Sequence, residues 1–178
     1  MTVTNVSQKK PDLILEQYFL GKTFASGIFE DRFGNVRRQF TVDIDGTWDG
    51  KTLTLTEDFI FGDGETETRV WSIEKIAPAS YVGTADDVIG SAKGIVSGNT
   101  LNWKYDMRLK VGGSKVKVHF DDWMFLQPNG VLINKATVSK LGLDIGRVTI
   151  AFTKKADADF LSTIPSTNKE PLVATLAR

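Results

Sequence analysis

Residues 101–126 read LNWKYDMRLKVGGSKVKVHFDDWMFL, two runs of alternating side chains separated by Gly112-Gly113. A Gly-Gly pair between two such runs is typical of a two-residue β-hairpin loop, which here pairs Val111 with Ser114. Counting outward, one face pairs Leu109 with Val116, Met107 with Val118, Tyr105 with Phe120, Trp103 with Asp122 and Leu101 with Met124. Only Asp122 interrupts this apolar face, which supports the register and predicts that the face is buried.

The opposite face of this hairpin is largely polar. It pairs Arg108 with Lys117, Asp106 with His119 and Lys104 with Asp121. Two of these pairs join opposite charges, as expected of a solvated face. Trp123 and Phe125 fall on it too, and we expect a helix or the tail to cover them. Left exposed, they would mark a contact site for another protein.

The same period of two continues along most of the chain. Alternating runs bounded by turn residues predict strands at about 23–31, 36–44, 52–61, 65–76, 81–96, 100–111, 115–126, 131–139 and 144–154. Short connections join antiparallel neighbours, and the lack of long amphipathic helices excludes a parallel α/β sheet. We therefore predict an all-β fold, a single antiparallel up-and-down β-barrel of the lipocalin-like kind with about nine strands. A sandwich is the alternative.

The two ends of the chain have a different composition. Residues 1–12 are predicted to be a disordered arm. A short helix is expected to begin after Asp12 as N-cap and to stop at Gly21, where it would plug one end of the barrel. The barrel is assigned to residues 13–155, and residues 156–178 to a C-terminal extension.

Charge and composition exclude several functions. Lys plus Arg and Asp plus Glu both number 22, so no global field attracts nucleic acid, and we interpret the run of Arg32, Arg37 and Arg38 among phenylalanines as a solvated edge. The absence of cysteine removes disulfides, thiolate metal sites and thiol catalysis. No apolar run is long enough for a signal peptide or a transmembrane helix, which leads us to expect a cytoplasmic protein.

A second hairpin supplies the most informative charged residues. The run Leu53, Leu55, Glu57, Phe59, Phe61 places one carboxylate on an apolar face. A turn centred on Asp63 sets Glu57 opposite Arg69 and Leu55 opposite Trp71. A lone buried carboxylate is costly, so an ion pair between Glu57 and Arg69 is expected. This pair is either a structural lock or part of a ligand site.

His119 is the only histidine, which excludes histidine clusters and conventional zinc sites. Because it alternates with polar residues opposite Asp106, a surface pair is favoured over haem ligation. We expect no metal and no other cofactor.

Several longer motifs resemble a known family. They are Glu57-Asp58-Phe59, Asp63-Gly64-Glu65 with Arg69-Val70-Trp71, Gly83-Thr84-Ala85-Asp86-Asp87, and Phe120-Asp121-Asp122-Trp123-Met124. Together they resemble the bacterial domain-of-unknown-function family numbered 3833, over about residues 16–154. The resemblance implies a lipocalin-type barrel and transfers no catalytic residue. Many relatives begin with a lipoprotein signal and an anchoring cysteine, which this sequence does not contain.

The leading functional hypothesis is a non-enzymatic protein that binds a small apolar molecule, such as a fatty acid or another lipid. The candidate lumen residues are Glu57, Arg69, Asp122, Trp71, Trp103, Tyr105 and Phe59. Arg69 would be the natural partner of a ligand carboxylate. One alternative is an isomerase, cyclase or hydratase that acts on a lipid-like substrate through Glu57 or Asp122. Another is a ligand-free accessory or interaction protein.

Overall fold

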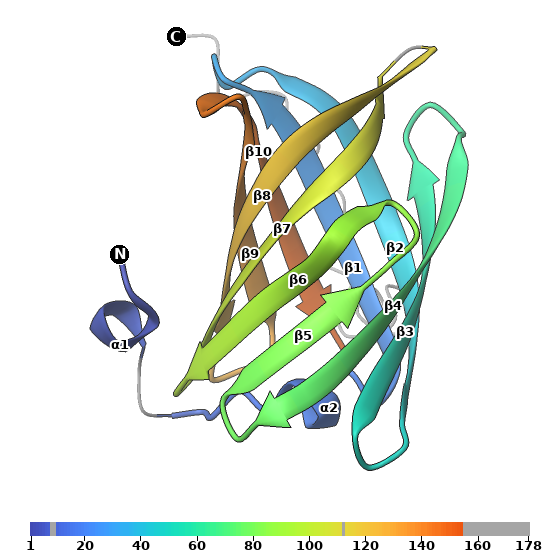
Figure 1. Cartoon of the computed structure of the whole chain (residues 1–178). Helices are drawn as coiled ribbons and strands as arrows, with labels where there is room; N and C mark the ends of the chain where they lie inside the picture. The colour runs from blue at the N-terminus through green and yellow to red at the C-terminus, as the bar shows by residue number, and fades with distance from the viewer. Residues whose placement is uncertain (8–9, 112, 155–178) are drawn as a thin grey trace, which may run out of the picture.

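The computed structural model describes residues 1–7, 10–111 and 113–154, and within them ten antiparallel strands form a closed barrel (Figure 1). The strands are β1 (Gly21–Asp31), β2 (Val36–Trp48), β3 (Thr52–Phe61), β4 (Thr66–Ala77), β5 (Ser80–Thr84), β6 (Val88–Ser97), β7 (Thr100–Val111), β8 (Ser114–Leu126), β9 (Leu132–Lys140) and β10 (Leu143–Thr153). Two short helices precede them, α1 (Val3–Val6) and α2 (Leu15–Tyr18). The predicted all-β barrel class is confirmed.

The strand count is ten because the predicted strand at 81–96 is two strands. The segment 85–87 turns the chain between β5 and β6, and the Val88 amide donates to the Ala85 carbonyl at 3.1 Å. Asp86 and Asp87 are typical turn residues, so the sequence contains the break signal. Counting the period of two straight through it gave one strand too few.

The predicted hairpin registers are confirmed. β7 and β8 pair from Val111–Ser114 through Trp103–Asp122 to Thr100–Phe125. β3 and β4 pair Glu57 with Arg69 and Leu55 with Trp71. Alternation therefore assigns inward and outward faces correctly in both hairpins.

The barrel closes where its first strand meets its last. β1 and β10 pair antiparallel over eight residue pairs, from Phe24–Thr153 to Asp31–Gly146. Five turns, β1–β2, β3–β4, β5–β6, β7–β8 and β9–β10, lie at one end, here called the rim; the other end, where α2 lies, is called the closed end (Figure 1).

Helix α2 packs its apolar side chains into the closed end of the barrel. Leu15 and Phe19 are buried there. The helix is shorter than predicted, its N-cap is Ile14, and no side chain caps it. Asp12 was therefore wrongly predicted as the cap, because its carboxylate instead pairs with Lys10 at 2.6 Å. Burial of apolar side chains, rather than capping, holds this short helix.

A polar contact also fixes α2 to the wall. Lys75 Nζ donates to Glu16 Oε1 at 2.5 Å, and the Tyr81 hydroxyl donates to Glu16 Oε2 at 2.7 Å. Burial raises the pKa of Glu16, but the hydrogen bonds from Lys75 and Tyr81 together lower it by more than burial raises it. The pKa of Glu16 therefore lies below its usual value. The carboxylate is therefore held in its charged form, which fastens the helix to β4 and β5.

Gly46 allows the helix to approach the wall. A Cβ atom at this position would lie 1.7 Å from the Phe19 carbonyl oxygen. Only a residue without a side chain fits here. The glycine of the Gly46-Thr47-Trp48 sequence on β2 is therefore required by the close approach of the Phe19 backbone at the closed end.

The N-terminal segment is not wholly irregular. Residues 3–6 form one helical turn, α1, which contacts β6 and β7. The predicted extension at 156–178 lies outside the described residues. None of the helices in the described ranges is long and apolar enough to cross a membrane.

Substitution Gly46→Ala is expected to lower the free energy of unfolding by roughly 1–3 kcal/mol, because the new methyl group overlaps the Phe19 backbone. Urea unfolding measures the difference. Gly62→Ala is the matched control, since a Cβ there meets its nearest neighbour at an ordinary 3.6 Å. Equal losses in the two variants would contradict the close approach of α2 to β2.

Candidate ligand-binding site

A cavity of about 1150 Å³ extends through the barrel from α2 to the rim. Its lower walls are lined by Leu15, Phe19, Leu55, Ile73, Leu101 and Phe152, and its mouth by charged residues of the rim hairpins. Ligand pockets of small-molecule binding proteins have volumes of roughly 300–1000 Å³ and mainly apolar walls. The lumen is therefore large enough for a small organic molecule.

The seven residues predicted to face the lumen all line this cavity. They are Glu57, Phe59, Arg69, Trp71, Trp103, Tyr105 and Asp122. They come from β3, β4, β7 and β8, where each occupies an inward position of its strand. The structure thus brings together side chains that are up to 65 positions apart in the sequence.

Aromatic rings form one continuous wall of the lumen. The Trp71 centroid lies 5.7 Å from that of Trp103 and 5.4 Å from that of Tyr105, both edge to face. Tyr105 in turn stacks on Phe120 at 5.0 Å. Such contacts orient the rings rigidly.

Trp103 lies close against the backbone of β6. A Cβ atom at Gly94 would come within 2.4 Å of its ring. Because Gly94 has no side chain, the Trp103 ring lies flat against the barrel wall and does not extend into the centre of the lumen.

Among the residues that the structure describes, Arg69 is the basic side chain that lies between the buried acids of the lumen, and it has three acidic neighbours. Its Nε donates to Asp87 Oδ2 at 2.9 Å, and its Nη2 lies 3.2 Å from Glu67 Oε1. The predicted partner Glu57 is more distant, with 3.8 Å between Arg69 Nη1 and Glu57 Oε2. The principal partner is thus Asp87, which sequence reasoning missed because it lies in the turn that was read as a continuous strand.

Glu57, Asp87 and Asp122 line the cavity beside this one guanidinium. Burial is the main cause that raises the pKa of Glu57 to about 7; the charge of Arg69 opposes this shift and the charge of Asp87 adds to it. Burial likewise raises the pKa of Asp122 to about 7, although the Tyr105 hydroxyl lowers it as a hydrogen-bond partner. Both acids therefore change charge near neutral pH.

Tyr105 stays protonated beside these acids. Burial and the charge of Asp122 raise the pKa of its hydroxyl well above the ordinary value. The hydroxyl therefore remains a hydrogen-bond donor in the lumen at any physiological pH.

Three buried acceptor atoms in the described part of the lumen have no hydrogen-bond partner: Asp87 Oδ1, Asp122 Oδ1 and Asn134 Oδ1. Asp122 and Asn134 are only 4% and 3% exposed, and all three residues line the cavity. An unsatisfied buried acceptor is costly, so these atoms are suited to accept hydrogen bonds from a bound molecule. Asn134 was missed, although the inward alternation of Leu132, Asn134 and Ala136 on β9 could have indicated it.

The outward face agrees with its predicted polarity. His119 Nδ1 lies 2.7 Å from Asp106 Oδ1, which makes the predicted surface pair. Trp123 and Phe125 on this face are half-buried rather than fully exposed.

The two lumen acids should make the stability of the protein depend on pH. Their folded pKa values, about 7, exceed the unfolded values of 4.5 and 3.8, so the folded chain binds more protons between these limits. Their contribution to the free energy of unfolding is complete below about pH 4 and is lost as the pH rises to about 7. Urea unfolding at pH 5 and at pH 8 measures this effect. Between these two pH values, the free energy of unfolding of the wild type should fall by roughly 2–4 kcal/mol more than that of Asp122→Asn.

Asp43→Asn, which removes a carboxylate on the outer face of β2, is the matched control. If Asp122→Asn and Asp43→Asn follow the same pH dependence, Asp122 does not titrate as described.

A search of solved structures finds a fold relative. The structure described as "Structure of S-type Phycobiliprotein Lyase CPES from Guillardia theta" matches with a TM-score of 0.57 and 6% sequence identity, over 79% of this chain and 90% of that chain. At this identity the match shows a similar barrel fold and nothing more. No curated protein matches the chain at a significant level.

The family is identified from the sequence as a whole. The model of the family described as "Protein of unknown function (DUF3833)" matches residues 1–154, which include every strand of the barrel. This chain belongs to the DUF3833 family, as its motifs predict.

Proposed function

We propose that the protein binds a small, largely apolar molecule of the lipid class in the barrel lumen. The observation that carries this proposal is a cavity of about 1150 Å³ with apolar and aromatic walls and a few buried polar groups. This combination is typical of ligand pockets: the apolar wall provides binding energy, and the polar groups fix orientation. The fold relative named above supports a barrel of the ligand-binding kind.

The polar cluster favours one kind of head group. Arg69 already has Asp87, Glu67 and Glu57 as neighbours, so it offers little uncompensated positive charge. A ligand carboxylate would meet further carboxylates, while the free acceptors of Asp122 and Asn134 require donors. A lipid with a hydroxyl, amide or amine head group therefore fits better than a fatty-acid anion.

An enzymatic role is the second candidate. Glu57 and Asp122 both line the cavity, and burial raises the pKa of each to about 7, which is suited to a general acid or base near neutral pH. The two roles differ in outcome: a binding protein returns its lipid unchanged, whereas an enzyme converts it and loses turnover in Glu57→Gln or Asp122→Asn.

Filling the lumen should abolish binding. Ala136 faces the cavity from β9, so Ala136→Trp places a large ring in it without removing a polar group. We expect the affinity for oleyl alcohol, measured by native mass spectrometry and calorimetry, to fall by roughly tenfold or more. Thr137→Trp, on the outward face of the same strand, is the control. Unchanged binding in the Ala136 variant, with an unchanged melting temperature, would refute the lumen as the site.

Head-group selectivity should follow from the acidic cluster. At pH 8 we expect oleyl alcohol and oleylamine to bind roughly tenfold more tightly than oleate, because the lumen carboxylates repel a further anion. Asp122→Asn should narrow this difference by improving oleate binding. Preferential binding of oleate would instead support Arg69 as a carboxylate anchor.

A further inference from the structure

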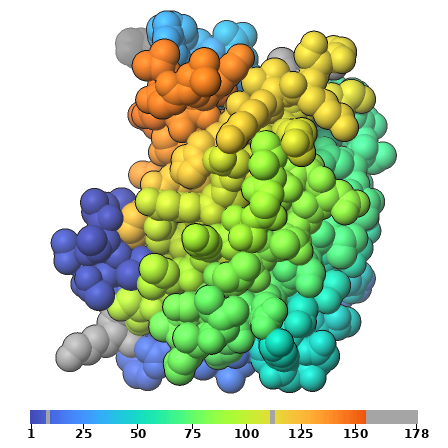
Figure 2. Space-filling model, in the orientation of Figure 1, coloured from blue at the N-terminus to red at the C-terminus, as the bar shows by residue number. Residues whose placement is uncertain are grey.

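Two neighbouring hairpin tips at the rim expose large apolar side chains. Phe33 at the β1–β2 tip is 75% exposed, and Leu141 at the β9–β10 tip is 94% exposed. Val36 and Leu143 beside them are exposed as well. Because β1 pairs with β10 as far as Asp31–Gly146, the two tips project from adjacent strands, and Figure 2 shows them together at the top of the molecule.

The residue at the β9–β10 tip is not one that the turn favours. Lys140 pairs with Leu143, which leaves Leu141 and Gly142 as a two-residue loop with φ values of 51° and 78°. Such a loop favours Asn-Gly or Asp-Gly, because Asn and Asp tolerate a positive φ through hydrogen bonds to the nearby backbone. A leucine side chain cannot form these hydrogen bonds. With 94% of its surface exposed, Leu141 also gains almost no contact within the chain. Folding therefore does not account for leucine here.

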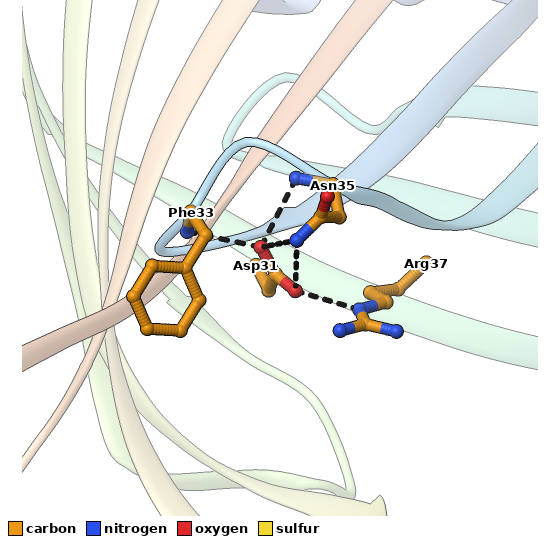
Figure 3. Close-up of polar contacts among 4 residues, drawn as sticks. All are labelled: Asp31, Phe33, Asn35 and Arg37. Carbon is orange, nitrogen blue, oxygen red and sulfur yellow. Dashed lines mark hydrogen bonds and ion pairs between the residues drawn. The ribbon is translucent and has the colours of Figure 1, made fainter.

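The β1–β2 tip is held in a defined conformation. Asp31 Oδ1 accepts hydrogen bonds from the backbone amides of Phe33 and Asn35 at 2.9 and 3.0 Å, and its Oδ2 accepts one from Arg37 Nε at 2.7 Å. The Phe33 ring points away from these contacts (Figure 3), and the Arg32 guanidinium lies 4.7 Å from the ring centre. The turn thus presents an aromatic ring and a cation outward together.

The charges around these tips are predominantly basic. Residues 31–37, 110–115 and 140–144, which form three of the rim hairpins, contain five Lys or Arg against two Asp, a net charge of +3. Within the described residues, several basic side chains at the rim form no ion pair: Arg32, Lys110, Lys115, Lys140 and Arg147. At the closed end, in contrast, Lys22, Lys51 and Lys75 are all paired with carboxylates. These five unpaired basic side chains therefore lie on the same half of the rim as the apolar tips.

We propose that this half of the rim docks on the surface of an anionic lipid bilayer. Exposed apolar side chains that enter the interface, flanked by Lys and Arg that meet acidic head groups, are the chemistry of peripheral membrane binding. Each basic residue near such a surface strengthens attachment by roughly fivefold. Arg37, Lys110 and Lys115 also line the mouth of the lumen, so docking brings this basic side of the mouth against the membrane.

Vesicle flotation of the full chain tests this proposal. We expect the protein to float with vesicles of equal parts phosphatidylcholine and phosphatidylglycerol, to remain unbound with phosphatidylcholine alone, and to be released by high salt. The double variant Phe33→Asn with Leu141→Asn should lower the vesicle partition coefficient by roughly tenfold or more. Folding should be kept, because asparagine suits the positive φ of residue 141.

The matched control replaces two exposed isoleucines on the wall near the closed end, Ile76→Asn with Ile95→Asn, and should bind vesicles as the wild type does. Three results would overturn the proposal: no flotation of the wild type with anionic vesicles, equal loss in the control, or a wild-type dimer in solution that the double variant abolishes without any vesicle binding. Lumen binding of oleyl alcohol is measured separately, so either proposal can fail alone.

Discussion

The pairing of β1 with β10 is the constraint on which the rest of the structure depends. Eight residue pairs join strands that lie at opposite ends of the described barrel sequence, and they turn an open sheet into a ring. A ring of ten strands is wider than side chains alone readily fill, which is why an interior cavity remains above the α2 plug. The size of the lumen, its separation from solvent at one end and its access at the rim all follow from that closure.

Within the lumen, the acidic side chains around Arg69 outnumber the basic ones. One guanidinium, Arg69, lies among Glu57, Asp87 and Asp122 in an otherwise apolar interior, and the two acids with raised pKa values reduce the excess negative charge by taking up protons. A molecule that donated hydrogen bonds to these acids, or carried a positive charge beside them, would stabilise their charged forms and lower their affinity for protons.

Much of the fold and part of the site were predictable, for identifiable reasons. Hairpin registers follow from turn chemistry and alternation, so the sequence alone correctly places Glu57, Arg69 and Asp122 on inward faces. Contacts that depend on three-dimensional placement were not accessible: Asp87 reaches Arg69 from a turn, and Glu16 meets Lys75 and Tyr81 from a helix. Periodicity places a side chain on a face but says nothing about which distant strand or turn lies across the barrel.

The aromatic wall gives the lumen an optical property. Trp71 and Trp103 are two of the four tryptophans in the chain, and both line the cavity within 5.7 Å of each other, whereas Trp123 lies on the outer face. Their emission therefore reports on the interior, next to carboxyl groups whose charge changes near neutral pH. The intrinsic fluorescence of these two tryptophans would therefore respond to a change in the charge of the neighbouring carboxyl groups or to a molecule placed against the rings.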